Sequence, residues 1–563
     1  MSVGASHADL HFEGERRGPP IDPLTGPPSA LAGRVVTMDP DHRVLSSGVV
    51  YVRAGQIVAV QPRDQPAPPG FEDVPVVPTR GTLYPGLIEL HNHLSYDALP
   101  LWDVPKAFVN REGWGGTSEY RKRISGPMTV IGRSPKLIPS LIRYVECKCL
   151  MGGVTTTQGV MLASNAGVRR FYRGLVRNVE QTDDPALPEA TARIDDVDAT
   201  DADRFLSRLK KQSCLLLHLA EGIDDRARKH FLALRVREDE WAITRQLAGI
   251  HCAGLKVPDF DVFARHGGAT IWSPLSNLLL YGRTADIKTA KASGVRLGIG
   301  SDWSPSGSKN LLGELKVAKL HSEAEGGVFT DRELVAMATS WAAEILQWTG
   351  ALGSLQRGAR ADILVIRSSH TDPYAALIGA TESDIALVLI NGVARYGMPS
   401  LMHRLSPHNQ SVRVGGRYRR LCLDQDTQDP SVGNVSLSDA REALCEALRD
   451  IRKLAVDLER PKPAPRRASA GALDEPGAAT WTLALDELHD TGVELRPRLP
   501  FGPGGERTGP SLGFDRAPTL LSEIVEPVAI DPLTVSDDSD YIDRLALQRN
   551  LSEDMKRGLK KLY

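Results

Sequence analysis

Two stretches of the chain alternate short apolar runs with turn-forming residues, a pattern typical of β-strands. The first, residues 30–83, contains RVVTMD and SGVVYVRAGQIVAVQPR, with the turn letters DPDH between their apolar parts. The second, residues 351–420, contains ADILVIRSS and DIALVLINGVARYG. Because these stretches flank one long middle segment, we predict a small β-sandwich domain built from both flanks.

The middle segment, residues 84–350, alternates apolar runs of strand length with longer amphipathic runs. Strand candidates include GVTTTQGV and SCLLLHLAE, helix candidates include SLIRYVECKCL and REDEWAITRQL, and EATARIDDVDA is a weak candidate for the fourth strand. Repeated βα units indicate a parallel sheet, and roughly 270 residues fit one (β/α)8 barrel. The predicted fold class is therefore α/β, a TIM-like barrel inserted in the β-sandwich domain.

The two ends of the chain differ in composition from the rest. Residues 1–29 are rich in Gly, Pro and charge and are predicted to form a flexible N-terminal arm. Residues 421–563 are predicted to form a mostly helical or irregular extension, in which SLSDAREALCEALRDIRKLAVDLERP is one helix begun by Ser436 or Ser438. After a Pro/Ala-rich linker, TWTLALDELHDTGVELRP and SEDMKRGLKKLY are expected to add helices. This extension contains no chemistry-bearing cluster and could cover the barrel, form a subunit contact or order a lid.

Charge and apolar content narrow the expected partners. Lys and Arg number 68 against 70 Asp and Glu, so no general attraction to nucleic acid or to an anionic membrane follows. The first residues lack the apolar core of a signal peptide, and no apolar run reaches transmembrane length. The six cysteines are too scattered for a disulfide framework. We expect a cytoplasmic homo-oligomer, most simply a dimer, that binds a small molecule and neither nucleic acid nor membrane.

The stretch LYPGLIELHNHLSY leads from an apolar strand into His91 and His93. Residues two apart on a strand point to the same face, so both imidazoles could converge on one point beyond the strand end. This is a spacing for metal ligands, although an isolated HxH also fits a polar loop after a buried strand.

Later apolar runs also end in ligand-type residues. In SCLLLHLAE, His218 ends the apolar run and Glu221 follows three residues later, GIHCAGL contains His251, and LGIGSDWS contains Asp302. A barrel would bring these strand ends together. Imidazoles with one carboxylate suit a divalent ion such as zinc, with iron as the alternative. Each of these residues could also have a purely structural role. His218 could be a buried strand histidine, Glu221 a carboxylate at a helix start, and Asp302 an N-cap.

The ordered motifs HNH, HLAE, GIHC, SPLSN and GSDWSPSGSKNLLGEL resemble those of the amidohydrolase superfamily. The resemblance is to the branch that contains cytosine and guanine deaminases, adenosylhomocysteine deaminases and triazine hydrolases. It extends over about residues 30 to 400 and includes the split β domain. The extension after residue 430 lies outside it.

The resemblance implies a role for each strand-end residue. The implied metal ligands are His91, His93, His218 and Asp302. Glu221 matches the residue that shuttles protons, and His251 matches the residue that polarises the attacking water or the departing oxyanion. On chemical grounds, Asp302 could also accept a proton while bound and so divide the transfer with Glu221. Members with two metals bridge them through a carboxylated lysine on strand four, and EATARIDDVDA has no lysine. One divalent metal ion is therefore predicted.

Candidates for substrate contact come from the long first loop and from the seventh strand. They are Trp102, Asp103, Trp114, Ser273 and Asn277.

The predicted function is metal-dependent hydrolysis of a C–N bond in a small cyclic or heteroaromatic substrate. Glu221 favours a deaminase, because a separate glutamate can protonate a leaving amine. The alternatives are ring opening of a cyclic amide, lactam or imide, and an inactive barrel that acts as a scaffold. The short zinc deaminases are excluded, since the chain has no CxxC.

Overall fold

The structure is a computed structural model of the 563-residue chain. It describes residues 27–165, 168–172, 174–193, 202–406, 408–425, 435–460, 480–485 and 520–563. Most of the predicted N-terminal arm, the Pro/Ala-rich linker and the end of EATARIDDVDA lie outside the described residues.

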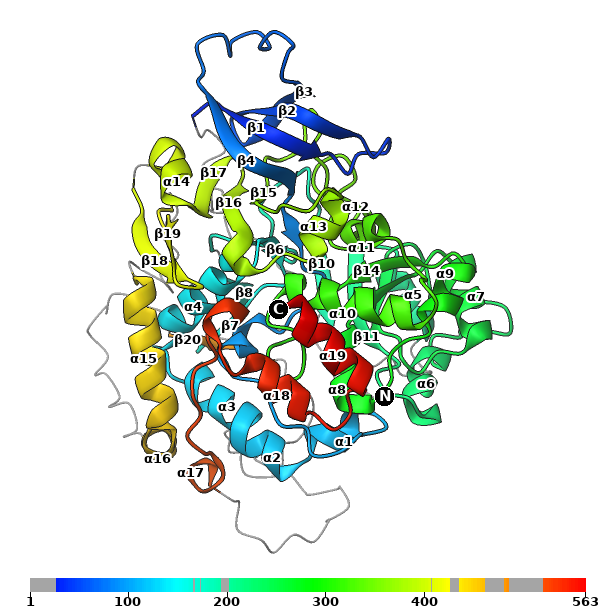
Figure 1. Cartoon of the computed structure of the whole chain (residues 1–563). Coiled ribbons are helices and arrows are strands. Elements are labelled where there is room, and N and C mark those ends of the chain that lie inside the picture. The colour runs from blue at the N-terminus through cyan, green and yellow to red at the C-terminus, as the bar shows by residue number, and fades with distance from the viewer. Residues whose placement is uncertain are drawn as a thin grey trace, which may run out of the picture.

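Strands from both flanks of the chain share one nine-stranded mixed sheet. Its strands are β1 (Ser29–Val36), β2 (Val44–Arg53), β3 (Gln56–Pro62), β4 (Val76–Pro85), β15 (Ile363–Ile366), β16 (Ile385–Ile390), β17 (Val393–Gly397), β18 (Gln410–Val414) and β19 (Arg417–Leu421). The flanks join where β4 pairs antiparallel with β15, with Leu83 opposite Val365. This order describes one continuous sheet, and the separation into the two facing sheets of a sandwich stays a prediction. Figure 1 shows the sheet running from β1, β2 and β3 at the top of the molecule to β18 and β19 at its left side.

Eight short strands of the middle segment form two parallel sheets in chain order. One sheet contains β5 (Leu87–Ile88), β6 (Val154–Thr157) and β9 (Arg177–Asn178), and the other contains β10 (Ala190–Arg193), β11 (Cys214–Leu219), β12 (Leu247–His251), β13 (Ala269–Trp272) and β14 (Arg296–Ile299). All six residues of β11 are buried, as expected for a parallel strand covered on both faces. The strand predictions for SCLLLHLAE and for EATARIDDVDA are thus confirmed as β11 and β10.

Helices separate most of these strands. They are α1 (Arg111–Gly115), α2 (Ser118–Tyr120), α3 (Gly126–Gly132), α4 (Ile138–Met151), α5 (Ala202–Leu209), α6 (Asp225–Leu232), α7 (Val257–Arg265), α8 (Pro274–Tyr281), α9 (Ile287–Ala292), α10 (Leu311–Ala324), α11 (Asp331–Met337), α12 (Ser340–Ile345), α13 (Pro373–Ile378) and α14 (Pro399–Leu405). There are also two 3₁₀ helices, η1 (Leu94–Ala98) and η4 (Glu382–Asp384), and a π-helical turn, η2 (Arg121–Ser125), in this part of the described chain. A hairpin of β7 (Met161–Ser164) and β8 (Arg169–Phe171) follows β6.

One predicted helix of the middle segment is wrong. REDEWAITRQL contains no helix, because its backbone folds back in an isolated bridge between Arg235 and Trp241. The Arg235 guanidinium also donates to the carbonyl of Glu238 and holds this turn. The helix lies earlier instead, as α6, where the Asp224 carboxylate accepts a hydrogen bond from Ala227 N and caps the first turn.

The C-terminal extension contains α15 (Leu437–Arg449), α16 (Ile451–Glu459), β20 (Trp481–Leu483), α17 (Leu521–Ile524), η5 (Val535–Asp537), α18 (Tyr541–Leu547) and α19 (Glu553–Leu562). Ser436 is the N-cap of α15, but the single predicted helix is wrong, since it divides at Asp450. The helix predicted for TWTLALDELHDTGVELRP is wrong over its first six residues, because Trp481–Leu483 pairs with β7 as β20, and the rest of this segment lies outside the described residues. The closing helix is confirmed as α19.

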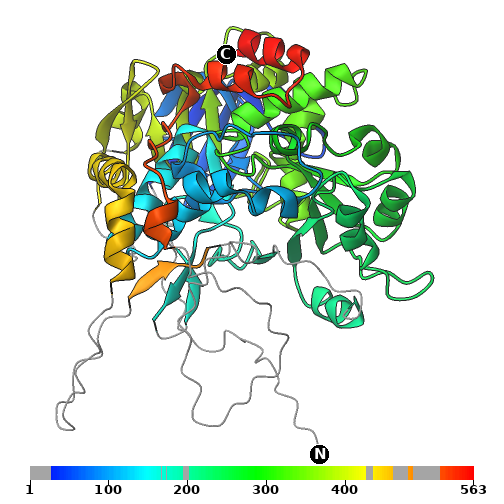
Figure 2. The ribbon, with the colours of Figure 1, turned by 90° about the horizontal axis from the view of Figure 1, so that it is seen from below.

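The extension contacts the rest of the chain at widely separated places. In Figure 1, α15 lies beside α4, whereas α19 lies across α10. Figure 2 shows α18 and α19 at one edge of the molecule and β20 toward the opposite edge. The described parts of the extension therefore pack on several elements of the middle segment.

Burial of Glu146 in α4 generates a prediction about stability. Burial raises the pKa of this carboxyl to about 7, although Arg143 and a hydrogen bond from Val176 N oppose the shift. Between the ordinary pKa near 4.5 and about 7, the folded protein keeps a proton that the unfolded chain has lost, so the free energy of unfolding falls as the pH rises. The total is about 3 kcal/mol.

The Glu146→Gln variant should remove this contribution. Thermal unfolding from pH 4.5 to 7 should then show a smaller loss of stability with rising pH than in the wild type. Glu442→Gln, on the exposed face of α15, is the control and should keep the wild-type slope. Equal slopes for the wild type and Glu146→Gln would contradict the assignment.

Candidate metal centre and active site

Six side chains named from the sequence lie together at the ends of the parallel strands. Their ligating atoms fall into three overlapping groups, each with all atoms within 4.8 Å of one another. The groups are His91, His93 and His218; His91, His251 and Asp302; and His218, Glu221 and His251. All six except His93 are buried. The chain thus gathers four imidazoles and two carboxylates at one point among its described residues.

Backbone contacts between the first and last parallel strands bring the two ends of this set together. Asp302 N donates to His91 O over 2.9 Å, and His93 N donates to Asp302 O over 2.6 Å. A Cβ on Gly300 would lie only 2.5 Å from His91 Cβ, so a glycine is needed for this approach. The Glu89 carboxylate adds hydrogen bonds from the amide and hydroxyl of Ser301, each 2.8 Å long.

The chain turns sharply just after two of the strands. His251 and Asp302 both have a φ of 68°, in the left-handed region that residues other than glycine rarely adopt. Such a conformation costs on the order of 1–3 kcal/mol and persists only where surrounding contacts impose it. The turns leave both side chains in the cluster at the strand ends.

The donor set fits a divalent cation. Burial lowers the pKa of the His91 and His218 imidazoles, which keeps them neutral, the form that binds metals. His91 Nδ1 donates to the amide oxygen of Gln158 over 3.2 Å, which leaves Nε2 as a lone-pair donor. That Nε2 lies 2.9 Å from Asp302 Oδ1, a separation at which one divalent cation could be bound by both atoms.

Gln158 was not among the residues named from the sequence. It lies just after β6 and also accepts a hydrogen bond from Asn92 N over 2.9 Å. A signal for it existed, since Gln158 is the polar residue inside the strand candidate GVTTTQGV, directly after VTTT, and the other ligand-type residues also lie at or near the ends of their strand candidates. It orients His91 from outside the donor set.

Glu221 is held from two sides by residues that sequence reasoning also missed. The hydroxyl of Tyr281, at the end of α8, donates to Glu221 Oε1 over 2.7 Å, and Trp114 Nε1 donates to that hydroxyl over 2.9 Å. Arg111 Nη1 lies 3.6 Å from Glu221 Oε2. Burial raises the pKa of Tyr281, so its hydroxyl stays a proton donor. No local pattern in the sequence distinguished Tyr281 or Arg111.

A close backbone contact brings Arg111 to Glu221. Asn110 forms an isolated bridge with Gly222, and a Cβ on that glycine would lie 2.6 Å from Asn110 Cα. The φ of Gly222, 137°, is likewise one that favours glycine. The glycine after HLAE therefore lets α1 approach the carboxylate.

The predicted substrate contacts have different surroundings. Asn277 Oδ1 accepts from His251 Nδ1 over 2.9 Å, while its amide nitrogen donates to Thr284. Ser273 is fully buried at the start of α8. Trp102 is buried against Phe108, and Asp103 is exposed. Asn277 thus fixes the orientation of His251 and the tautomer with a proton on Nδ1.

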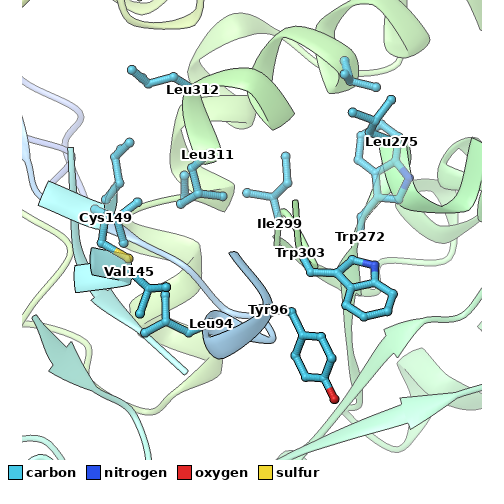
Figure 3. Packing of buried hydrophobic residues seen from close by; sticks show 14 of the residues in the cluster. Leu94, Tyr96, Val145, Cys149, Trp272, Leu275, Ile299, Trp303, Leu311 and Leu312 are labelled. Atoms are coloured by element: carbon cyan, nitrogen blue, oxygen red, sulfur yellow. The ribbon is translucent and has the colours of Figure 1, made fainter. Parts of the chain in front are cut away.

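Aromatic rings stand beside the cluster. Trp303, the residue after Asp302, has its ring 5.6 Å from that of His93 and 5.3 Å from that of Tyr96. Trp114 adds a ring 5.9 Å from Trp303. Figure 3 shows Tyr96 and Trp303 next to each other at the edge of the buried apolar cluster. These rings form an apolar wall next to the imidazoles.

A small cavity reaches the cluster from the α1 and α6 side. Its lining residues are Asn110, Arg111, Glu112, His218, Glu221, Arg226, Ala227 and His230. Since His218 and Glu221 form its inner wall, a small polar molecule could approach the predicted proton carrier along this route.

The amidohydrolase family model matches residues 82–395, which is more than half of the chain. The chain belongs to the amidohydrolase family. The matched region includes all six clustered residues and ends before the C-terminal extension. The resemblance inferred from the motifs is therefore confirmed.

Curated relatives of this amidohydrolase carry hydrolase and deaminase names. It is 24% identical over 389 residues to the 5-methylthioadenosine/S-adenosylhomocysteine deaminase of Desulforudis audaxviator, which covers 62% of this chain and 88% of the relative. It is 30% identical over 158 residues to the S-triazine hydrolase of Gordonia rubripertincta, which covers 26% of this chain and 33% of the relative.

Solved structures share its fold. An adenosine deaminase from Xanthomonas campestris with bound zinc aligns with a TM-score of 0.50 at 18% identity, covering 67% of this chain and 94% of the other. The guanine deaminase of E. coli aligns with a TM-score of 0.50 at 15% identity, covering 66% and 100%. These neighbours imply a barrel of the TIM type.

Family membership and the curated relatives identify this amidohydrolase as a metal-dependent hydrolase of carbon–nitrogen bonds, and the predicted enzyme class is confirmed. Within the described residues, none of the helices has the length and apolar character that a membrane crossing requires.

Proposed function

We propose that this amidohydrolase is a deaminase that removes an exocyclic amino group from a small heteroaromatic substrate. The observation that carries the proposal is the placement of Glu221, a buried carboxylate held by Tyr281 beside the imidazoles of His218 and His251. The curated relatives named as deaminases support the same reaction.

The proposed ligands of a single divalent ion, zinc, are His91, His93, His218 and Asp302. When bound, the ion would act as a Lewis acid that makes a water molecule nucleophilic near neutral pH. A second ion would need a bridging group from the fourth strand, and β10 (Ala190–Arg193) offers no lysine. The zinc in the adenosine deaminase neighbour supports the choice of metal.

Proton transfer is assigned to two residues. Asn277 keeps the proton of His251 on Nδ1, so Nε2 of His251 can accept a hydrogen bond from the attacking water. Glu221 Oε2 lies 3.8 Å from that nitrogen and can take the proton of the water. Tyr281 occupies Oε1 of the same carboxylate and thereby fixes which oxygen faces the imidazoles. Glu221 then delivers the proton to the leaving amine, which departs as ammonia.

The aromatic wall is the proposed platform for the substrate ring. Trp303 presents a flat apolar surface close to His93, Trp114 adds another beside Trp303, and offset stacking of a heteroaromatic ring on such faces is favourable. Arg111 borders the cavity and lies close to Glu221, so it is placed to contact a polar substituent.

The eight parallel strands are proposed to form one closed (β/α)8 barrel over residues 84–350. Ala190 N donates to Val179 O over 2.8 Å and so links the two parallel sheets. At the other edge, Asn92 forms a parallel bridge with Asp302 beyond the ends of β5 and β14. Both contacts lie where closure of a barrel requires them.

Metal analysis tests the ligand assignment. The purified protein should contain about one equivalent of zinc, because four ligands of this kind complete a mononuclear site. Alanine at His218 should abolish stoichiometric zinc, whereas alanine at the cavity residue His230, which lies outside the proposed ligand set, should keep it. Metal-free wild-type protein, or two equivalents per chain, would refute the assignment.

Replacement of Glu221 by Gln tests the proton carrier. The variant should keep its zinc but lose about 10²- to 10⁴-fold in kcat, because the amide cannot carry the proton. Ammonia release from adenosine, 5-methylthioadenosine, guanine and aminotriazines is the assay, and Glu112→Gln at the cavity rim is the control. Near-normal turnover by Glu221→Gln, or a ring-opened product from the true substrate, would count against a deaminase.

Replacement of Tyr281 by Phe tests the hydrogen bond that holds Glu221. Loss of a hydrogen bond to a charged group typically costs about 1.5–3 kcal/mol, so kcat should fall about 10- to 100-fold. Zinc content should be unchanged, since Tyr281 bonds to Glu221, which is not a proposed ligand, whereas Gln158 bonds to the proposed ligand His91. The exposed Tyr418→Phe variant serves as the control, and wild-type kcat for Tyr281→Phe would exclude this role.

A further inference from the structure

The C-terminal segment 520–563 places one carboxylate deep in the protein. Asp531 is fully buried, and its Oδ2 accepts a hydrogen bond from Lys148 Nζ of α4 over 2.6 Å. Its Oδ1 is paired with Lys309. The backbone is anchored as well, because Asp531 N donates to Ala98 O over 2.9 Å and Tyr144 donates to Asp531 O over 2.5 Å. A residue outside the family match is therefore buried within the middle segment.

The ammonium group held by Asp531 reaches both loops that carry the proposed metal ligands. Lys148 Nζ donates to Ser304 Oγ over 2.6 Å, and Ser304 is two residues after Asp302. Lys148 Nζ also donates to the carbonyl of Asp97 over 2.8 Å. Asp97 belongs to η1, the turn that follows His91 and His93. A single cation thus links the residues after β14 to the residues after β5.

The Asp97 side chain completes this connection. Its Oδ1 accepts hydrogen bonds from Ser304 N over 2.8 Å and from Ser304 Oγ over 3.0 Å. Its Oδ2 accepts from the Asn92 amide over 3.0 Å, and Asn92 lies between the two histidines of the HNH motif. From Asp531, a continuous chain of hydrogen bonds runs through Lys148, Ser304 and Asp97 to the side chain of Asn92 in the HNH motif.

The same segment also makes hydrogen bonds to the loop after η1, which contains Trp102. Gln548 Oε1 accepts from Val104 N over 3.2 Å, and Gln548 Nε2 donates to Trp102 O over 3.0 Å. Asn550 donates to Leu279 O, two residues before Tyr281. These contacts fix the loop after η1 and the end of α8 from the side of the extension.

We propose that Asp531 is a positioning residue for the metal centre. Through Lys148 and Ser304 it sets the relative position of the two loops that carry His93 and Asp302. The inference rests on the proposed ligand set. The proposal gives the C-terminal extension a role in metal retention. The other described contacts of the extension, such as the packing of α15 against α4, do not require such a role.

The balance of charge explains why a carboxylate is needed at this position. Lys148 and Lys309 are both almost fully buried, and each is within 3 Å of Asp531. Without the carboxylate, Lys309 would keep its ion pair with Asp538 over 2.9 Å, whereas Lys148 would lose its ion pair with Asp531, and burial of an unpaired charge is strongly unfavourable. Lys148 would then turn toward other acceptors and leave Ser304.

The test uses the full-length, zinc-loaded protein and its variants Asp531→Asn and Ser304→Ala. Zinc transfer to a colorimetric chelator is followed at 25 °C, with the circular dichroism spectrum and Tm measured in parallel. Loss of outer partners of metal ligands typically costs about 10- to 100-fold in metal affinity or activity, so both variants should release zinc about tenfold faster or more. Asp554→Asn, an exposed residue of α19, is the matched control and should release zinc at the wild-type rate.

The outcomes separate a positioning role from a structural one. Faster zinc release in both variants, with a native spectrum, supports the inference. A lowered Tm for Asp531→Asn with the wild-type release rate overturns it, because the residue would then only stabilise the fold. If Asp531→Asn does not fold, Ser304→Ala decides alone, since it keeps the buried ion pairs. A wild-type protein without zinc would overturn the proposed function and this inference together.

Discussion

Two backbone hydrogen bonds join the residues after β5 to those after β14: Asp302 N donates to His91 O, and His93 N donates to Asp302 O. The donors and acceptors of these bonds belong to the same residues whose side chains form the cluster. Any displacement of the last strand relative to the first would therefore separate the carboxylate from the imidazoles. The small residue Gly300 and the buried carboxylate Glu89 maintain the approach.

The surroundings of the cluster control its protonation and orientation. Burial lowers the pKa of the His91 and His218 imidazoles, and single amide groups fix two of the rings: Gln158 accepts from His91, and Asn277 accepts from His251. The Glu221 carboxylate is instead held by a hydrogen bond that it accepts from the hydroxyl of Tyr281. Neutral rings and a restrained carboxylate are the arrangement that combines metal binding with proton transfer.

The secondary structure was predictable where local pattern and tertiary contacts agree. SCLLLHLAE became β11 because a run of large apolar residues can be buried only between two layers. The failures lie where contacts distant in the sequence decide. Trp481–Leu483 is a strand because β7 offers it a free edge, and REDEWAITRQL folds back because Arg235 binds backbone carbonyls. Local propensity contains no information about either partner.

For the site, the sequence alone determined the residue types, their order and their positions after apolar runs, which suffices to predict a metal-dependent hydrolase. The end of a strand can be recognised from the local sequence, and the parallel strands of a barrel bring their carboxyl ends together. Only the tertiary structure decided which groups hold these residues: Tyr281 lies 60 residues from Glu221, and Asp531 lies 383 residues from Lys148. Such contacts depend on how separate elements pack, and packing depends on the shape of the whole interior rather than on any local pattern.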